Sequence, residues 1–232
     1  MKNRNNEIEK ELTSQGAKLI RFIDISHLSE TQNRQFPHAI VFALPLTARY
    51  VKEICDTPNY VKDRIADNYN FDDDEYLITE HKTHKLADNI AKDIMEKGYK
   101  AFSQSDESLI AEGKYDEAHR RSLLPNKTIA ILGGLGWIGK NNLLITSEYG
   151  AAQCLGTVLT DAPLETVRLE PPLPKCGKCN VCIDICETQV LKNKTCSPTT
   201  SRDEIVDVHG CSTCLKCMVH CPRTQIYMSK NL

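Results

Sequence analysis

The sequence predicts an α+β protein with two domains, a larger one over residues 1–170 and a smaller one over residues 171–232. Segments with helical and strand periodicity follow one another without the regular strand–helix–strand order that a doubly wound sheet requires. Near the C-terminus, two cysteine-rich runs follow a segment with four prolines at residues 163–174, which is typical of a stiff linker. The chain of 232 residues is long enough for one substantial core and a small second domain.

Apolar periodicity, together with glycine and proline stops, gives the elements of the larger domain. We expect a helix at 5–16, strands at 17–25 and 39–44, a helix-rich stretch at 49–97, and strands at 99–103 and 155–160. Residues 39–44 are apolar without interruption, which predicts a strand covered on both faces. Leu86, Ile90, Ile94 and Met95 recur at helical spacing, and we expect them in the core. Residues 104–126 are polar and predict a loop over a pocket.

The acidic run Asp72-Asp-Asp-Glu75 has two interpretations. Clustered carboxylates could hold a metal ion. The run also precedes a predicted helix, where carboxylates interact favourably with the positive end of the helix dipole. We favour the second interpretation.

Composition restricts the classes of function. The formal net charge is −2 with 26% charged residues, so no overall basic field favours nucleic acid. The N-terminus is polar and lacks the apolar run of a signal peptide, and no stretch approaches the roughly 18 apolar residues of a membrane span. Eleven cysteines without a secretion signal indicate a reducing compartment and metal ligation. We therefore expect a cytoplasmic protein without membrane partners.

Two runs of the form C-x2-C-x2-C-x3-C carry the strongest signal in the sequence. The first begins at Cys176, and the second lies 35 positions later and is followed by Pro222. This pattern holds [4Fe–4S] clusters, and in two-cluster proteins the fourth cysteine of each run ligates the other cluster. The predicted ligand sets are Cys176, Cys179, Cys182 and Cys221 for one cluster, and Cys211, Cys214, Cys217 and Cys186 for the other.

Zinc and disulfides are the alternatives for these cysteines. Structural zinc usually takes ligands as two separated pairs, and disulfides are typical of small secreted chains, so two iron–sulfur clusters are favoured. Glu187 stands where a proline usually follows the fourth cysteine, which changes the turn but removes no ligand. Cys55, Cys154 and Cys196 are left without an assigned role.

A glycine-rich stretch forms the second informative region. Gly134, Gly136 and Gly139 spell G-x-G-x-x-G, yet too few residues follow for the helix that a dinucleotide fingerprint opens. The stretch also nearly matches a phosphate-binding loop, but Asn141 replaces the Ser/Thr that would hold magnesium. The glycines predict close approach of the backbone to a ligand or to a neighbouring element. Trp137 would then either wall that ligand or fill the core.

These motifs together closely resemble the epoxyqueuosine reductase family. The stretches that carry the resemblance are residues 134–150 (GLGWIGKNNLLITSEYG), residues 155–163 (LGTVLTDAP) and the paired cysteine runs, with a weaker likeness at His84-Lys85 and residues 99–102. Reductive dehalogenases are similar in architecture. The resemblance implies a cobalamin-binding domain of nitroreductase-like α+β fold, joined to a ferredoxin-like domain with two [4Fe–4S] clusters.

The resemblance also implies where a corrinoid would bind. The implied cofactor-binding residues are Gly136, Trp137, Gly139, Lys140 and Asn142. The motif D-x-H-x-x-G, which ligates cobalt through a histidine, fails at its last position in residues 207–212. That failure agrees with a base-off corrinoid that has no histidine ligand, and His209 is expected to be a surface residue or a neighbour of the cluster.

The implied function is a cobalamin-dependent reductase. Its clusters would accept electrons from a ferredoxin or flavodoxin-like donor and pass them to cobalt, which would reduce a small molecule or a modified nucleoside. Family members usually continue into a helical-repeat region that helps to hold tRNA, and this chain is expected to be a short branch without it. With its slightly negative charge, the sequence gives no general support for tRNA binding.

The catalytic acid is the main departure from the family. Epoxyqueuosine reductases have it in the segment that matches residues 99–105, where this chain has Gln104, and Asp106 lies two residues on. Tyr149 and His119 are weaker candidates for a proton donor. Two alternatives stay open: a non-catalytic electron carrier or reductive activator of a corrinoid protein, and a flavin-binding N-terminal domain.

Overall fold

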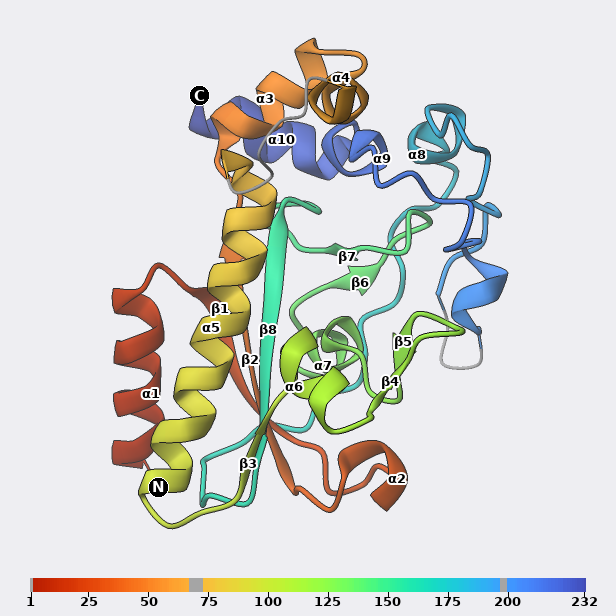
Figure 1. Ribbon diagram of the computed structural model, residues 1–232. Coiled ribbons are helices and arrows are strands. Elements are labelled where there is room, and N and C mark those ends of the chain that lie inside the picture. The colour runs from red at the N-terminus through yellow and green to blue at the C-terminus, as the bar shows by residue number, and fades with distance from the viewer. Residues whose placement is uncertain (1, 67–72, 197–199) are drawn as a thin grey trace. The chain divides into compact units, whose positions relative to one another are not determined.

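A computed structural model of the protein describes residues 2–66, 73–196 and 200–232 (Figure 1). The chain divides into two compact units. Unit 1 comprises residues 1–44, 79–135 and 154–171, and unit 2 comprises residues 45–78, 136–153 and 172–232. The chain passes from unit 1 to unit 2 for the last time after residue 171, next to the expected boundary at residue 170. Two internal segments that the sequence assigned to the larger domain belong instead to the unit that holds the cysteine runs.

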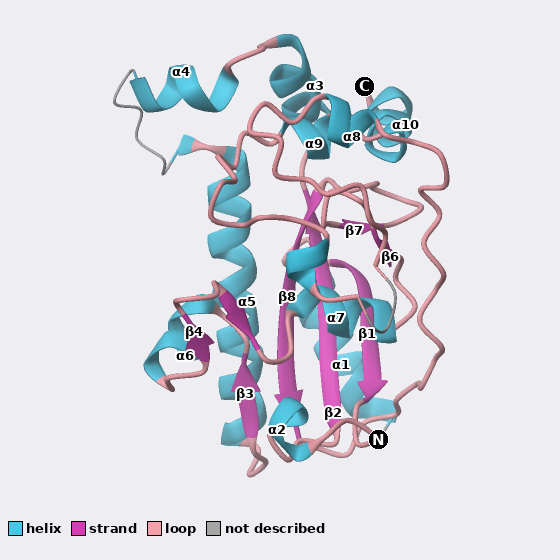
Figure 2. Ribbon diagram, turned by 90° about the vertical axis from the view of Figure 1, so that its right-hand side faces the viewer, coloured by secondary structure: helices cyan, strands magenta, loops and turns pink. Residues whose placement is uncertain are grey.

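A four-stranded sheet forms the centre of unit 1 (Figure 2). Its strands, in spatial order, are β1 (Lys18–Asp24), β2 (His38–Pro45), β8 (Gln153–Thr160) and β3 (Ala101–Ser103). β1 pairs antiparallel with β2, and β3 pairs antiparallel with β8. Residues 39–44 are buried throughout, which confirms the expectation from their apolar run. β3 is an edge strand, and Gln104 follows its last residue.

Two helices supply the apolar layer on this sheet. α1 (Lys2–Ser14) and α5 (Glu75–Glu96) contribute Leu12, Leu86 and Ile90 to a buried cluster with Phe42 of β2. Gly16 has φ +92° just after α1, as a glycine stop requires. Ile94 is buried as expected. The expectation for Met95 was wrong: its side chain is half exposed, because it lies one residue past the buried stripe of the helix.

The rest of unit 1 consists of short elements. They are α2 (Glu30–Asn33), α6 (Asp106–Ala111), the hairpin of β4 (Tyr115–Asp116) and β5 (Arg121–Ser122), and α7 (Asn126–Leu132). The stretch at 104–126 therefore contains a capped helix and a hairpin where the sequence predicted a loop. Within the described part of the chain, no helix is both long enough and apolar enough to cross a membrane.

Unit 2 is built from short helices and one small hairpin. They are α3 (Ala48–Asp56), α4 (Tyr60–Ala66), β6 (Trp137–Ile138), β7 (Leu144–Ile145), α8 (Val181–Asp184), the 3₁₀ turn η2 (Arg202–Glu204), α9 (Lys216–Val219) and α10 (Pro222–Asn231). α3 packs against α9 and α10. The hydroxyl of Tyr227 on α10 donates to the carbonyl of Leu46 at 2.7 Å. These contacts explain why residues 45–78 group with the cysteine runs.

The acidic run before α5 acts as a helix cap. The Asp74 carboxylate is buried and accepts from the backbone N–H of Tyr76 at 2.9 Å and from the hydroxyl of Tyr50 at 2.8 Å. Burial, followed by this carboxylate, raises the pKa of Tyr50. Glu75 accepts from the hydroxyl of Thr47. The capping interpretation is confirmed for Asp74, while Asp72 lies outside the described residues.

Candidate functional site

The eight cysteines of the paired runs all lie in unit 2, on turns and on the ends of short helices. Cys182 lies in α8, Cys217 lies in α9, and Cys221 precedes Pro222 at the first position of α10. Proline is favoured there because its missing N–H would have no partner in the first helical turn. The backbone of the second run is unusual, since Thr213 and Leu215 adopt left-handed φ values of 53° and 61°.

Burial and three cysteines raise the pKa of the Cys182 thiol. Its pKa rises to about 11, chiefly because it is buried and next because charges on Cys176, Cys221 and Cys179 would repel its own. These are the three cysteines that the sequence spacing groups with it. Cys221 comes from the second run, so it reaches the first group across a separation of 35 residues or more in the chain.

The pKa of the Cys217 thiol is raised by burial and by cysteines of the other predicted group. Its pKa rises to about 12, again chiefly through burial, and then through Cys214, Cys211, Cys182 and Cys186. Three of these complete the second expected group, and Cys186 is its crossed-over member. Cys182 belongs to the first group, so the two groups adjoin.

Among residues 2–66, 73–196 and 200–232, no three His, Cys, Asp or Glu side chains converge closely enough to hold one metal ion. The preference for [4Fe–4S] clusters over zinc therefore stays a prediction from the cysteine spacing.

Apolar side chains and one ion pair surround the second group. Val190, Leu191 and Val206 form a buried cluster with Cys186. An apolar shell limits access of water and thereby influences the potential of a bound cluster. Glu187, which stands where a proline was expected, makes an ion pair with Lys216 on α9 and so links the two runs.

The glycine-rich stretch is a tight hairpin that is not followed by a helix. β6 and β7 pair antiparallel across residues 139–143. A Cβ added to Gly136 would lie 2.0 Å from the carbonyl oxygen of Ile145, and one added to Gly139 would lie 2.6 Å from Oδ1 of Asn141. Gly136 is therefore required by close approach of two backbone segments, whereas the contact at Gly139 is with the end of a side chain. This observation agrees with rejecting the dinucleotide and phosphate-loop interpretations, since both need a following helix.

This hairpin is anchored to both cysteine runs, and the turn that follows it is anchored to α10. The Lys140 Nζ donates to Oδ1 of Asn180 at 2.8 Å, between Cys179 and Cys182. The amide of Asn141 donates to the carbonyl oxygen of Cys217 at 3.0 Å. The backbone N–H of Ala151 donates to the hydroxyl of Thr224 at 2.9 Å, and Gly150 packs on the same turn of α10.

Trp137 is the first residue of β6 in this hairpin. Its side chain is buried, and the cationic groups of Lys175 and Arg223 lie 5.7 and 5.8 Å from its ring centre. Lys175 directly precedes the candidate ligand Cys176, and Arg223 follows Cys221 by two positions. The indole Nε1 is buried and finds no acceptor within the described part of the chain. Asn142 has φ +60° and turns the chain toward β7.

Gln104 is the most deeply buried of the candidate catalytic residues, with 2% of its surface exposed. Its Nε2 donates to Oδ1 of Asn126 at 3.3 Å, whereas its Oε1 has no donor in residues 2–66, 73–196 or 200–232. Asp106 is exposed in the first turn of α6, which Ser105 caps. The structure therefore places the amide inside the protein and the carboxylate outside it.

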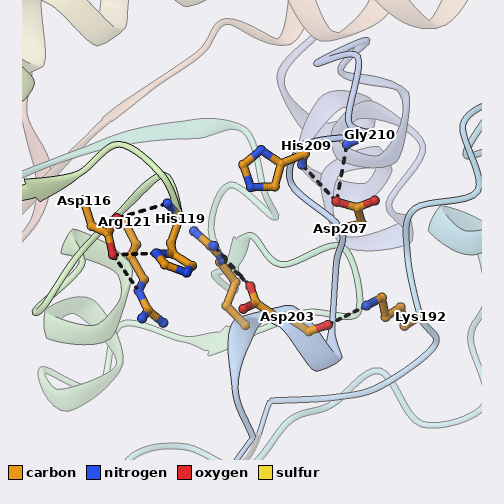
Figure 3. Close-up of polar contacts among 9 residues, drawn as sticks. Asp116, His119, Arg121, Lys192, Asp203, Asp207, His209 and Gly210 are labelled. Atoms are coloured by element: carbon orange, nitrogen blue, oxygen red, sulfur yellow. Dashed lines mark hydrogen bonds and ion pairs between the residues drawn. The ribbon is translucent and has the colours of Figure 1, made fainter.

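The two weaker candidates have other partners. His119 faces Asp116 at 2.8 Å in an exposed ion pair, which Arg121 extends (Figure 3). Tyr149 packs edge-on against the ring of Tyr227, and burial raises its pKa. These contacts describe structural roles for both residues.

The segment that fails the cobalt-ligand motif is a surface turn. The carboxylate of Asp207 accepts from the backbone N–H groups of His209 and Gly210 (Figure 3). His209 is exposed, which agrees with the expected surface position. Of the three remaining cysteines, Cys154 is buried in β8, Cys55 lies 3.1 Å from the amide of Gln225, and Cys196 is half-buried.

Several residues of this region carry no signal that a single sequence could reveal. Asn180, Lys175 and Arg223 lie within two positions of a cysteine, but their spacing alone does not relate them to the glycine-rich stretch. Thr157 and Asn126 are ordinary residues of a strand and a helix start. Their importance comes from tertiary contacts, which pattern reasoning does not provide.

Comparison with known proteins finds similarity to epoxyqueuosine reductases. No family model matches the chain. The epoxyqueuosine reductase of Vibrio cholerae is 28% identical over 148 residues, which cover 64% of this chain and 34% of that protein. The enzyme of Listeria monocytogenes is 35% identical over 116 residues, which cover 43% of this chain and 29% of that protein. The match therefore spans about a third of the length of these curated relatives.

Solved structures show the same fold. An epoxyqueuosine reductase bound to a tRNA stem loop matches with a TM-score of 0.55 and 15% identity, over 96% of this chain and 66% of that one. A reductive dehalogenase, described as suggesting a mechanism for B12-dependent dehalogenation, matches with a TM-score of 0.56 and 13% identity, over 79% and 25%. The expected resemblance to both groups is confirmed, as is the mixed α and β character of the fold.

Proposed function

We propose that this protein is an iron–sulfur oxidoreductase of the epoxyqueuosine reductase type, with two [4Fe–4S] clusters and a corrinoid that together reduce an organic substrate. The observation that carries this proposal is the attachment of the hairpin at residues 136–145 to both cysteine runs. Lys140 holds the first run through Asn180, and Asn141 holds the second through the carbonyl of Cys217. The residues implied to bind the cofactor are thereby fixed against the residues implied to hold the clusters.

The thiol groups fit two clusters. Each of Cys182 and Cys217 is half-buried and lies within electrostatic reach of the three cysteines that would complete its set. Their raised pKa values favour neutral thiols in the protein without iron. Ligation requires thiolates, so cluster assembly would release protons and contribute folding free energy to unit 2.

The surroundings of Trp137 fit an organic cofactor with hydrogen-bond acceptors. The Nε1 of this buried indole has no acceptor within the described residues, and an unmade bond of this kind costs about 1–3 kcal/mol. Gly136, Gly139, Lys140 and Asn142 would hold the hairpin in shape. A bound corrinoid supplies low-valent cobalt, a strong nucleophile and reductant. The positive charges of Lys175 and Arg223 would stabilise negative charge on a group bound next to the indole.

The proton for the reduction needs a separate source. The amide of Gln104 is not an acid, so Gln104 would orient a bound group through its free Oε1. Asp106 is the candidate for the proton donor because it lies two residues away and is exposed at the start of α6. We propose a ferredoxin or flavodoxin-like electron donor. We propose a small molecule or modified nucleoside as substrate, since a relative of similar fold was solved with a tRNA stem loop.

The test is a cofactor titration on anaerobically purified protein whose iron and sulfide have been reconstituted. Cobalamin and FMN are added separately, and the visible spectrum reports binding. Saturable cobalamin binding with a base-off spectrum supports the proposal. The variant Trp137→Phe keeps an aromatic ring but removes the Nε1–H donor, so its cobalamin affinity should fall about fivefold, the value of one hydrogen bond. Clusters without binding of either compound would support an electron carrier or activator instead.

A further inference from the structure

Two buried side-chain oxygen atoms without hydrogen-bond partners, one of an amide and one of a hydroxyl, lie at the edge of the sheet in unit 1. Ser103 of β3 pairs with Val158 of β8, and the backbone N–H of Gln104 donates to the carbonyl oxygen of Thr157 at 2.9 Å. Gln104 and Thr157 therefore occupy opposite positions of an antiparallel pair, where side chains project from the same face. Their exposed fractions are 2% and 0%.

Both side chains lack a partner for an oxygen atom. The Oε1 of Gln104 and the Oγ1 of Thr157 make no hydrogen bond to any residue that the structure describes. More than nine in ten buried polar groups in proteins are paired, so two unpaired ones on neighbouring positions require an explanation. A bound group with a hydrogen to donate provides one.

A chain of hydrogen bonds determines which atom Gln104 presents. The Nδ2 of Asn126 donates to the carbonyl oxygen of Leu155 at 3.2 Å, and a carbonyl can only accept. The Oδ1 of Asn126 must therefore face Gln104, whose Nε2 donates a hydrogen bond to it. Rotating either amide would break this chain. The free atom of Gln104 is consequently its oxygen.

We propose that Gln104 and Thr157 form a two-acceptor subsite that receives an N–H group of an organic cofactor. The ligand chemistry is that of an amide or imide. Cobalamin carries primary amides on its periphery and a flavin carries an imide N–H on its ring, so both share this chemistry. The proposal rests on the function proposed above in one respect, namely whether the bound cofactor is cobalamin or a flavin.

Two substitutions on the same strand test the subsite. Thr157→Val removes an unpaired hydroxyl, so the melting temperature of the cofactor-free protein should stay the same or rise. Thr160 is equally buried, but its hydroxyl donates to the carbonyl of Lys100 at 2.7 Å and accepts from the N–H of Ala162 at 3.0 Å. Thr160→Val should therefore lower the melting temperature, and it serves as the matched control.

Cofactor binding supplies the second readout. In the full chain with reconstituted clusters, Thr157→Val and Gln104→Met should each weaken the bound cofactor about fivefold, whereas Thr160→Val should leave its affinity unchanged. The proposal is overturned if Thr157→Val lowers the melting temperature as much as Thr160→Val does. It is also overturned if both subsite variants bind the cofactor as the wild type does.

The two titrations separate this proposal from the function. Cobalamin binding that is insensitive to both subsite variants would retain the reductase and reject the subsite. Binding of FMN but not cobalamin, weakened in both variants, would reject the corrinoid and retain the subsite. If the wild type binds neither compound, the subsite is rejected, and the iron content still reports on the clusters.

Discussion

Unit 1 and the cysteine-bearing part of unit 2 are stabilised in different ways. Unit 1 has a sheet, two long helices and a buried apolar cluster around Phe42. The cysteine-bearing part has helices of four residues, α8 and α9, and only a small apolar cluster beside Cys186. Isolated helices of that length are unstable. The first region can fold through burial of apolar area, whereas we expect the second to depend on the clusters proposed for its cysteines.

The largest expected effect comes from Cys217→Ser. Cys217 lies between both groups of thiols, so its loss should remove one cluster, lower the iron content from about eight to about four per chain, and loosen unit 2. Iron analysis and limited proteolysis of the anaerobic protein measure this. Cys154→Ala, in β8 of the sheet, is the control and should keep the full iron content. Equal iron loss in both variants would contradict the predicted ligand set.

Phe42→Ala should instead lower the stability of unit 1 without removing iron. Phe42 is fully buried against Gly156, and truncation of such a side chain costs about 3–5 kcal/mol through lost burial and the cavity left behind. Denaturant unfolding followed by circular dichroism measures the loss. Iron bound per folded chain should stay at the wild-type level, and a proportional loss of iron would show that the clusters require an intact core in unit 1.

A smaller effect is expected for Gly150→Ala, which tests how the turn after the hairpin packs on α10. Gly150 has φ +58°, and an added Cβ would lie 2.3 Å from the backbone nitrogen of Thr224. The left-handed backbone alone costs about 1–2 kcal/mol for alanine. Gly98→Ala is the control, because Gly98 has φ +87° with nothing within 4 Å. Gly150→Ala should be the more destabilising variant in thermal unfolding, and equal losses would refute the close packing.

The smallest effect concerns an ion pair of unit 1. Hydrogen bonds from Ser26, and then Arg168, hold the pKa of Asp24 below its usual range. A carboxylate with a lowered pKa contributes stability above its unfolded-state pKa and loses it as the pH falls through the folded-state value. The gain should be under about 1 kcal/mol because the pair is partly exposed. Asp24→Asn should flatten the stability curve below pH 4, and an unchanged curve would contradict this contribution.

The sequence predicts the parts of this molecule whose signal is local. The apolar run of β2, the glycine stop after α1 and the capping role of Asp74 were each visible in a few consecutive residues. The cysteine spacing also predicts two ligand sets with a crossover between the repeated runs, and this stays a prediction. The likeness to epoxyqueuosine reductases came from the glycine-rich stretch and was confirmed by comparison.

The features that sequence reasoning missed are tertiary. Met95 was misplaced because periodicity does not fix the edge of a buried stripe to one residue. Residues 45–78 and 136–153 belong with the cysteine runs because α3 packs on α10 and Asn141 reaches Cys217. The unpaired acceptors of Gln104 and Thr157 follow from a strand register and a helix start that are distant in the chain. No periodicity reports such contacts.

The most direct measurement is the metal content of the protein purified without oxygen. Inductively coupled plasma analysis should give about eight irons per chain, with acid-labile sulfide in equal amount and no stoichiometric zinc, as two cubane clusters require. One or more equivalents of zinc, or four irons or fewer in the fully reconstituted wild type, would contradict the account.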